Sequence, residues 1–178
     1  MRRTLLPLSL ILPMAFAEPA TAADRPAAPE VVIRDPSFNW NRFYVGAFAG
    51  AWLDYPAITF DTARAGGVLG RNVTIGDRFM IGAELAAGVY TGPAYPDPVF
   101  ETYATIRGGL RFDKAFLYGS AALGYDTVFG TSNTLGGGVE FAINSMMTVR
   151  ADAQLWAGTG APFDYLSVTG GVSWYIRR

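Results

Sequence analysis

Hydrophobic and polar residues alternate with a period of two from Gly137 to Leu155. This period predicts two β-strands joined by a tight turn, because successive side chains of a strand point to opposite faces of a sheet. The apolar face would carry Val139, Phe141, Ile143, Val149, Ala151, Ala153 and Leu155. The other face would carry Glu140, Arg150, Asp152 and Gln154. A strand with one hydrophobic face and ionisable groups on the other is typical of a transmembrane β-barrel wall, with lipid outside and polar packing inside.

The same pattern along the rest of the chain predicts eight strands. The expected segments are 43–53, 65–75, 79–90, 102–112, 116–126, 134–143, 147–155 and 166–176. Each is close to the about 9 to 11 residues that a tilted strand needs to cross a bilayer. Tight turns at 76–78, 113–115 and 144–146 would alternate with longer loops at 54–64, 91–101, 127–133 and 156–165. We therefore predict an all-β, eight-stranded antiparallel up-and-down transmembrane β-barrel, with the tight turns and both chain ends in the periplasm.

The alternation assigns faces in most of these strands. In 79–90 the odd-numbered residues share an apolar face that excludes Glu84, and in 102–112 the even-numbered residues oppose Arg107 and Arg111. In 65–75, however, Arg71 shares its phase with Leu69 and Val73, so the pattern leaves the two faces of this strand unassigned.

Six ionisable residues are expected to point into the lumen, because an arginine that faces lipid near the bilayer midplane costs about 2 to 4 kcal/mol. They are Glu84, Arg107, Arg111, Glu140, Arg150 and Asp152. Buried charges must pair with one another, and we expect Arg150 to pair with Glu140. Such a network would plug an eight-stranded lumen, which is just wide enough for side chains. It would serve as structural packing, which we favour, or as a gate that re-pairs to admit ions.

Aromatic residues collect near the expected strand ends, where rings with one wet edge are favoured at membrane interfaces. The periplasmic girdle would contain Phe43, Phe79, Phe112, Phe116 and Trp174. The outer girdle would contain Trp52, Tyr55, Tyr90, Tyr125, Phe129 and Trp156. The alternative is that these rings fill a soluble core.

The first residues predict export. Arg2 and Arg3 precede an apolar run over 5–16 and small residues at 15–17 and 20–22, which together indicate a secretory signal peptide. We assign 1–22 to the signal peptide, 23–39 to a flexible, Pro- and Ala-rich periplasmic leader and 40–178 to the barrel. The chain has no cysteine, so it does not rely on disulfides after export.

Composition argues against several classes of function. The chain has no histidine, which removes the Ser-His and Asp-His arrangements of acyl hydrolases and proteases. The acids Asp97, Glu101 and Asp164 would lie in unrelated loops, so we expect no enzyme. Without histidine or cysteine only weak oxygen ligation of a metal remains, and we expect no metal or cofactor. A net charge of −1 without a basic stripe argues against nucleic acid.

Several motifs resemble a known family. They are Gly137–Ile143 with Thr148–Leu155, Phe43-Tyr44-Val45-Gly46, Gly82-Ala83-Glu84 and Gly171–Trp174. Over the mature chain they resemble the small porin-like outer-membrane β-barrel proteins with an OmpA-like transmembrane domain, as in alphaproteobacterial surface proteins. The family usually ends in an aromatic residue, where this chain has Ile176 followed by Arg177 and Arg178.

The resemblance implies an eight-stranded barrel in the outer membrane of a Gram-negative bacterium. Its implied partners are outer-membrane lipid, lipopolysaccharide and, during insertion, the barrel-assembly machinery. It also implies a salt-bridge network between interior carboxylates on the third or sixth strand and cations on the fourth and seventh. Glu84, Glu140, Arg107 and Arg150 occupy those positions here.

The expected function is therefore structural: a barrel that contributes to cell-envelope integrity, with a plugged lumen and at most weak passage of ions or small solutes. The first alternative is a surface adhesin or host-interaction protein that acts through its extracellular loops. The second is a soluble, lipocalin-type barrel with its apolar faces turned inward. The sequence does not determine an oligomeric state.

Overall fold

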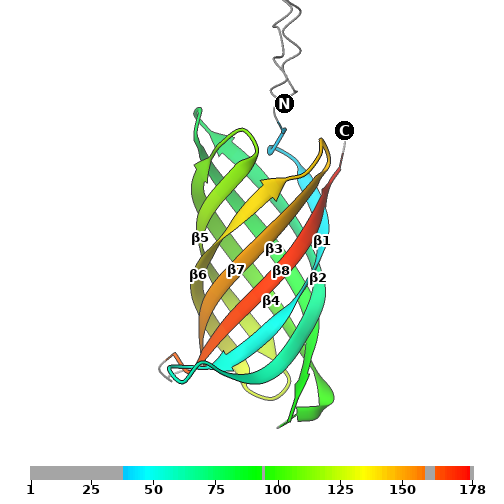
Figure 1. Ribbon diagram of the computed structural model, residues 1–178, viewed down its shortest axis with the longest axis vertical. Helices are drawn as coiled ribbons and strands as arrows, with labels where there is room; N and C mark the ends of the chain where they lie inside the picture. Colours follow the sequence, from blue (N-terminus) through cyan, green and yellow to red (C-terminus); the bar gives the residue numbers. More distant parts are fainter. Residues whose placement is uncertain (1–37, 94, 159–162, 177–178) are drawn as a thin grey trace, which may run out of the picture. The chain divides into compact units, whose positions relative to one another are not determined.

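The computed structural model describes residues 38–93, 95–158 and 163–176. They form a closed barrel in which eight antiparallel strands follow one another in chain order and β8 pairs with β1 (Figure 1). The strands are β1 (Phe43–Asp54), β2 (Thr59–Ile75), β3 (Phe79–Gly92), β4 (Tyr95–Arg111), β5 (Ala115–Asp126), β6 (Gly130–Ala142), β7 (Met147–Gly158) and β8 (Tyr165–Tyr175). The predicted all-β, eight-stranded antiparallel fold is confirmed. The described residues include no helix long and apolar enough to cross a membrane.

The two ends of the barrel differ. The turn end holds the connections 76–78, 112–114 and 143–146, together with the start of β1 and the end of β8. The loop end holds the connections 55–58, 93–94, 127–129 and 159–164. The strands run obliquely between these ends (Figure 1). The predicted signal peptide at 1–22 and almost all of the predicted leader at 23–39 lie outside the described residues.

Three strands begin at least four residues earlier at the loop end than the sequence suggested. β2 begins at Thr59 rather than at 65, β4 at Tyr95 rather than at 102, and β6 at Gly130 rather than at 134. The sequence estimate took strand length from bilayer thickness, but backbone pairing continues farther, as far as Asp54 with Thr59 and Gly92 with Tyr95. The prediction of longer loops was therefore wrong for 54–64, 91–101 and 127–133, because much of that sequence is strand, whereas the connection 159–164 is longer than any of the turns.

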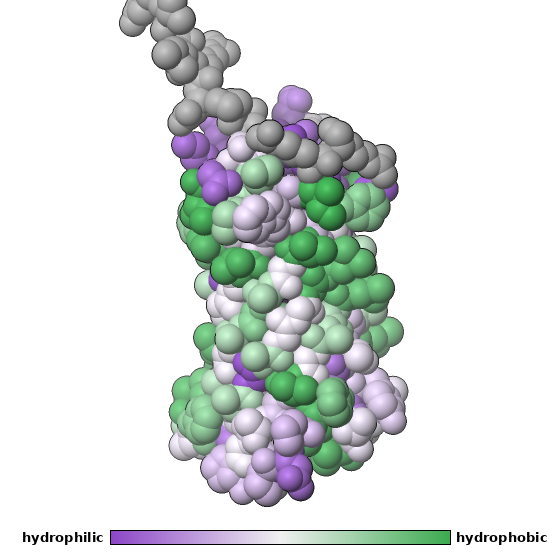
Figure 2. All heavy atoms as spheres, turned by 90° about the vertical axis from the view of Figure 1, so that its right-hand side faces the viewer, coloured by the Kyte–Doolittle hydropathy of each residue, from purple (hydrophilic) through white to green (hydrophobic). Residues whose placement is uncertain are grey.

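The barrel wall is apolar on the outside. Large hydrophobic side chains are exposed along it, with Ile106 and Leu123 each 68% exposed, whereas Glu140 is 0% exposed in the lumen. In β3 and β4 the predicted faces are confirmed: the odd-numbered residues of β3 from Phe79 to Val89 lie outside, and Arg107 lies inside. Hydrophobic residues cover the middle of the wall in Figure 2, and hydrophilic residues gather toward its ends.

The structure also settles the facing of β2. Leu69, Arg71 and Val73 point outward, and Gly70 and Asn72 point into the lumen. The register decides this: Gly70 pairs with Tyr44 of β1 on one side and with Glu84 of β3 on the other. Because directly paired residues point to the same side of a sheet, the inward phase of β2 follows from its neighbours.

Aromatic side chains fill both ends of the lumen. The turn-end cluster consists of Phe38, Trp40, Tyr44, Met80, Phe116, Tyr118 and Tyr175. The loop-end cluster consists of Trp52, Tyr90, Val99, Tyr103 and Trp156. Phe38, at the end of the predicted leader, is only 4% exposed and stacks edge-on against Tyr175. Phe38 and Trp40 therefore pack into the mouth of the barrel.

The predicted aromatic girdles need correction. Phe116, Trp52, Tyr90 and Trp156 were expected at the lipid interface, but all four are buried in the lumen. Their position near strand ends did not decide their facing, because strand parity does, and each has the inward parity of its strand. The remaining predicted members are exposed: Phe43, Phe79, Phe112, Trp174, Tyr55, Tyr125 and Phe129.

Gly70 makes room for the ring of Tyr44. A Cβ added at Gly70 would overlap the Tyr44 phenol, whereas a Cβ at Gly67, which faces outward on the same strand, would find its nearest neighbour at 3.7 Å, the Gly46 carbonyl oxygen. Overpacking of a tight interior costs about 1 to 3 kcal/mol.

We expect Gly70→Ala to lower the free energy of unfolding of the detergent-refolded barrel by that amount. Gly67→Ala is the matched control and should leave it nearly unchanged. Denaturant unfolding followed by tryptophan fluorescence measures both variants. Equal stability of the two would show that Tyr44 does not lie over Gly70.

Candidate functional site

The middle of the lumen holds a cluster of five charged side chains, which we call the central cluster. It consists of Glu84 on β3, Arg107 on β4, Glu140 on β6, and Arg150 and Asp152 on β7. Strand alternation turns all five inward. They are five of the six residues that the sequence analysis selected for the lumen.

Arg107 lies between two carboxylates. Its Nη1 is 3.1 Å from Oε1 of Glu84 and 3.0 Å from Oε2 of Glu140. Its Nη2 donates a hydrogen bond to Oδ1 of Asn72 at 3.0 Å. The guanidinium also lies 5.0 Å from the ring centre of Tyr118 and 5.1 Å from that of Tyr44. One cation thus neutralises charge on β3 and β6 at once, in contact with aromatic faces that attract it.

Arg150 forms ion pairs with the other carboxylates of the cluster, Glu84 and Asp152. Its Nη1 donates to Oε1 of Glu84 at 2.6 Å, and its Nε lies 3.3 Å from Oδ2 of Asp152. Arg150 is the register partner of Glu140, but the predicted pairing of these two is wrong, since Glu140 forms its ion pair with Arg107. The long side chain of Arg150 reaches across the narrow lumen rather than to its neighbour.

Hydroxyl groups complete the coordination of the carboxylates. Tyr175 Oη and Thr148 Oγ1 donate to Oε1 of Glu140 at 3.0 and 2.5 Å. Tyr118 Oη donates to Oδ1 of Asp152 at 2.5 Å, and Tyr44 Oη donates to Glu84. Hydrogen bonds to ionised groups are stronger than neutral ones, so these donors help to hold the carboxylates charged inside the barrel.

Every strand contributes to this network. One member per strand, in order from β1 to β8, is Tyr44, Asn72, Glu84, Arg107, Tyr118, Glu140, Asp152 and Tyr175. Asn72 links two parts of it, because it accepts from Arg107 and donates to Tyr175 Oη at 2.8 Å. The network therefore fastens the strands to one another across the lumen, in addition to the backbone pairing around the wall.

A second charged layer lies nearer the loop end. Arg64 Nη2 is 2.8 Å from Oε1 of Glu101, and its Nη1 donates to Ser167 Oγ at 2.8 Å. Tyr103 Oη donates to Oε2 of Glu101 at 2.9 Å. This pair was not predicted from the sequence, because both residues were expected in loops. The signal was present: continuing the alternation backward from Arg107 puts Glu101 on the inward face.

Arg111 does not belong to the central cluster. It lies in the last position of β4, at the turn end, where its Nη2 donates to the backbone carbonyl of Asp77 at 2.6 Å. It shares the inward parity of Arg107, but three residues of β4 lie between the two along the strand. Arg111 therefore holds the turn at 76–78 through this hydrogen bond and does not join the charged residues in the middle of the lumen.

The carboxylates of the central cluster are satisfied by groups of the barrel itself. Each carboxylate of the central cluster faces a guanidinium and receives at least one hydroxyl donor. No group of three His, Cys, Asp or Glu side chains within the described ranges is placed to hold a metal ion. These side chains lie in the lumen between the two aromatic clusters.

Comparisons with known proteins support the fold. No protein-family model and no curated protein matches this chain. Among solved structures, Ail, the attachment invasion locus protein of Yersinia pestis, in complex with the heparin analogue sucrose octasulfate, is 14% identical, with a TM-score of 0.50 over 75% of this chain and 96% of Ail. At this identity the likeness shows the barrel fold alone.

Two further structures are similar over nearly their whole length. The N-terminal β-barrel domain of Pseudomonas aeruginosa OprF is 13% identical, with a TM-score of 0.48 over 76% of this chain and 98% of that domain. A de novo designed transmembrane β-barrel is 12% identical, with a TM-score of 0.47 over 79% of this chain and 99% of the design.

We expect Arg107→Gln to be strongly destabilising, because it leaves Glu84 and Glu140 buried without the cation between them. Removing one partner of a buried ion pair costs about 3 to 5 kcal/mol. The double variant Arg107→Gln/Glu140→Gln should lose less than the single one, since it also removes one of the stranded charges.

Arg111→Gln is the control for this experiment, as it removes the same charge from β4 at the turn end. Denaturant unfolding in detergent measures all three variants. A loss in Arg111→Gln as large as that in Arg107→Gln would contradict the assignment of Arg107 as the bridge.

Proposed function

We propose that this chain is a structural protein of the outer membrane of a Gram-negative bacterium and contributes to the integrity of the cell envelope. The observation that carries the proposal is the reversed polarity of the barrel. Leu85, Ile106 and Leu123 are exposed on the wall, whereas Glu84, Arg107 and Glu140 are at most 8% exposed inside it. A soluble, lipocalin-type barrel would need the opposite arrangement.

Closure of the barrel fits the same environment. β1 pairs with β8 from Tyr44 with Tyr175 to Asp54 with Tyr165, so the sheet has no free edge. In hydrocarbon no water is present to satisfy backbone groups, and a closed barrel satisfies them all around the wall. The exposed aromatic residues Phe79, Trp174 and Tyr125 lie toward the strand ends, where rings favour a membrane interface.

The charges at the two ends indicate an orientation. Exposed or half-buried cations lie at the turn end: Arg42, Arg78, Arg111 and Lys114. The turn end also carries two exposed acids, Asp77 and Asp113, whereas the exposed or half-buried ionisable residues that the structure describes at the loop end are all acids: Asp54, Asp61, Asp97 and Asp164. We place the turn end in the periplasm, the usual side of the short turns and chain ends of such barrels. Partners would be outer-membrane lipid, lipopolysaccharide at the loop end, and the barrel-assembly machinery during insertion.

The filling of the lumen favours a structural role over a channel. Going along the barrel, the loop-end aromatic cluster, the layer of Arg64 and Glu101, the central cluster and the turn-end aromatic cluster occupy the interior. An eight-stranded barrel leaves room for little more than these side chains. Passage of ions would require two ion-pair layers to rearrange.

The adhesin alternative has less support. Ail was solved with a heparin analogue, a polyanion, but the loop end of this barrel carries Asp54, Asp61, Asp97 and Asp164, and its one buried cation, Arg64, is paired with Glu101. Acids repel an anionic polysaccharide. The short connections at 55–58, 93–94 and 127–129 also offer little loop surface for recognition.

We expect single cysteines to report the two faces, since the chain has no cysteine of its own. In the barrel refolded into vesicles, a hydrocarbon-soluble maleimide should label Ala151→Cys on the outer wall and spare Ser120→Cys in the lumen. Mass spectrometry measures the labelled fraction. Both variants should react after unfolding, which controls for intrinsic reactivity.

Labelling of the residue 120 variant with sparing of the residue 151 variant would refute the membrane orientation of the wall. A chain that stays folded and monomeric in plain buffer would do the same.

We expect the refolded protein to show no lasting open state in planar lipid bilayers, because Arg107 and Arg64 each hold an ion pair across the lumen. At most, small and brief current steps should appear. A steady, large conductance would contradict the structural role while leaving the membrane location intact. Bilayers treated with detergent alone supply the baseline.

A further inference from the structure

Two shallow apolar grooves lie side by side on the outer wall over β2 to β6. Their volumes are about 730 and 720 Å³. Both are lined by Arg71, Ala83, Ile106 and Ala121, which are successive register partners across β2, β3, β4 and β5. The two alanines keep the wall low along this row, because their neighbours on either side are larger.

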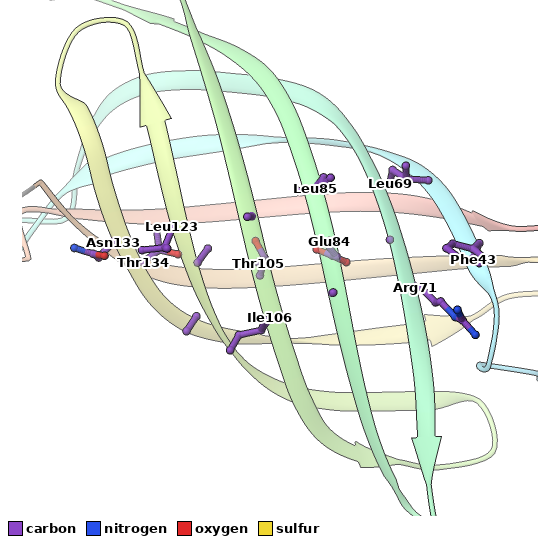
Figure 3. Close-up of a pocket in the computed structure, with 15 residues that line it drawn as sticks. Phe43, Leu69, Arg71, Glu84, Leu85, Thr105, Ile106, Leu123, Asn133 and Thr134 are labelled. Carbon is purple, nitrogen blue, oxygen red and sulfur yellow. The ribbon is translucent and has the colours of Figure 1, made fainter.

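The first groove has walls of larger residues. Leu69, Leu85 and Leu123 form the next row of register partners through Ala104, and they stand 50%, 63% and 68% exposed. Figure 3 shows Arg71 and Phe43 at one end of this groove and Leu123 and Asn133 at the other. The groove is thus mainly apolar, with a cation at one end and the amide of Asn133 at the other.

Arg71 is unusual on this wall. Among the described strand residues, and apart from Asp61 at the register shift between β1 and β2, it is the only charged side chain with outward parity. Its guanidinium lies 4.8 Å from the ring centre of Phe43, the first residue of β1, so it sits toward the turn end. A cation on a lipid-facing wall is costly away from the interface, and no carboxylate on the regular outward face of the described strands neutralises it.

We propose that the first groove binds a glycerophospholipid of the periplasmic leaflet, with the phosphodiester at Arg71 and an acyl chain along Leu69, Leu85 and Leu123. The inference rests on the proposed membrane function. Guanidinium groups bind phosphate through two parallel hydrogen bonds, which suits an interfacial arginine. The apolar row supplies the contact surface that a free phosphate would not use.

The position of the cation selects the lipid. Arg71 lies near the turn end, which the proposed orientation places in the periplasm, and the acids Asp54, Asp97 and Asp164 lie at the loop end. The phosphates of lipopolysaccharide would meet the acidic end, whereas the phosphate of a glycerophospholipid in the other leaflet would meet Arg71. The acyl chain would then run obliquely across β3 and β4 toward β5.

The test uses the refolded full chain in detergent micelles titrated with phosphatidylglycerol, and native mass spectrometry measures the retained lipid. We expect Arg71→Gln to weaken retention about tenfold or more, as expected for the loss of a charge-assisted hydrogen bond of about 1.5 to 3 kcal/mol. Arg78→Gln, which removes the same charge at the exposed turn, should retain lipid like the unaltered chain.

A second pair of variants tests the groove itself. Ala121→Trp should fill it and reduce retention, whereas Ala151→Trp on the outer face of β7 should not. Equal retention by Arg71→Gln and the unaltered chain would overturn the inference, and so would equal losses in Arg71→Gln and Arg78→Gln. Tighter retention of lipid A than of phosphatidylglycerol at Arg71 would overturn the assignment of the leaflet.

Insertion of the same variants is measured separately, by protease protection after refolding into phosphatidylglycerol vesicles. A chain that inserts but does not retain lipid at Arg71 refutes the groove and leaves the proposed function standing. A chain that fails to insert refutes the proposed function, and the groove with it.

Discussion

The bridge that Arg107 makes between Glu84 and Glu140 is the interaction on which the rest of the barrel depends. Three carboxylates and the guanidinium group of Arg107 are buried in the middle of the lumen, and the side chain of Arg150 beside them is only 10% exposed. Such charges are tolerated only when each faces an opposite charge or a good hydrogen-bond donor. Arg107 meets that requirement for β3 and β6 together, and Arg150 and the tyrosine hydroxyls meet it for the rest.

This central network explains why the outer wall of the barrel is almost entirely apolar. Because the polar contacts that join the strands are made inside, the wall can consist of apolar side chains, with Arg71 as its one regular charged position in the described strands. The same division suits a bilayer, where hydrocarbon must touch the wall and backbone groups must be satisfied around the ring. A lumen filled in this way suits a role in the envelope better than transport.

The alternation of residues predicted much of this arrangement. It turned Glu84, Arg107, Glu140, Arg150 and Asp152 inward, because parity within a strand depends only on the local chain. The alternation did not predict Arg64 and Glu101 as lumen residues, because strand length was taken from bilayer thickness. These two residues lie where the strands extend past that length. It misplaced Trp52 and Trp156, because an aromatic residue near a strand end suits either an interface or the mouth of the lumen.

The sequence by itself determined the number of strands, their order and the parity of the charged residues, all of which follow from local periodicity and turn signals. Only the tertiary structure decided which charges meet. Glu140 and Arg150 are neighbours in register, yet Glu140 pairs with Arg107, since the inward side chains of β4 and β6, the strands on either side of β5, meet in the narrow lumen. Strand pairing likewise decided that Arg71 faces outward, because the facing of β2 follows from its register with β1 and β3 and not from its own mixed pattern.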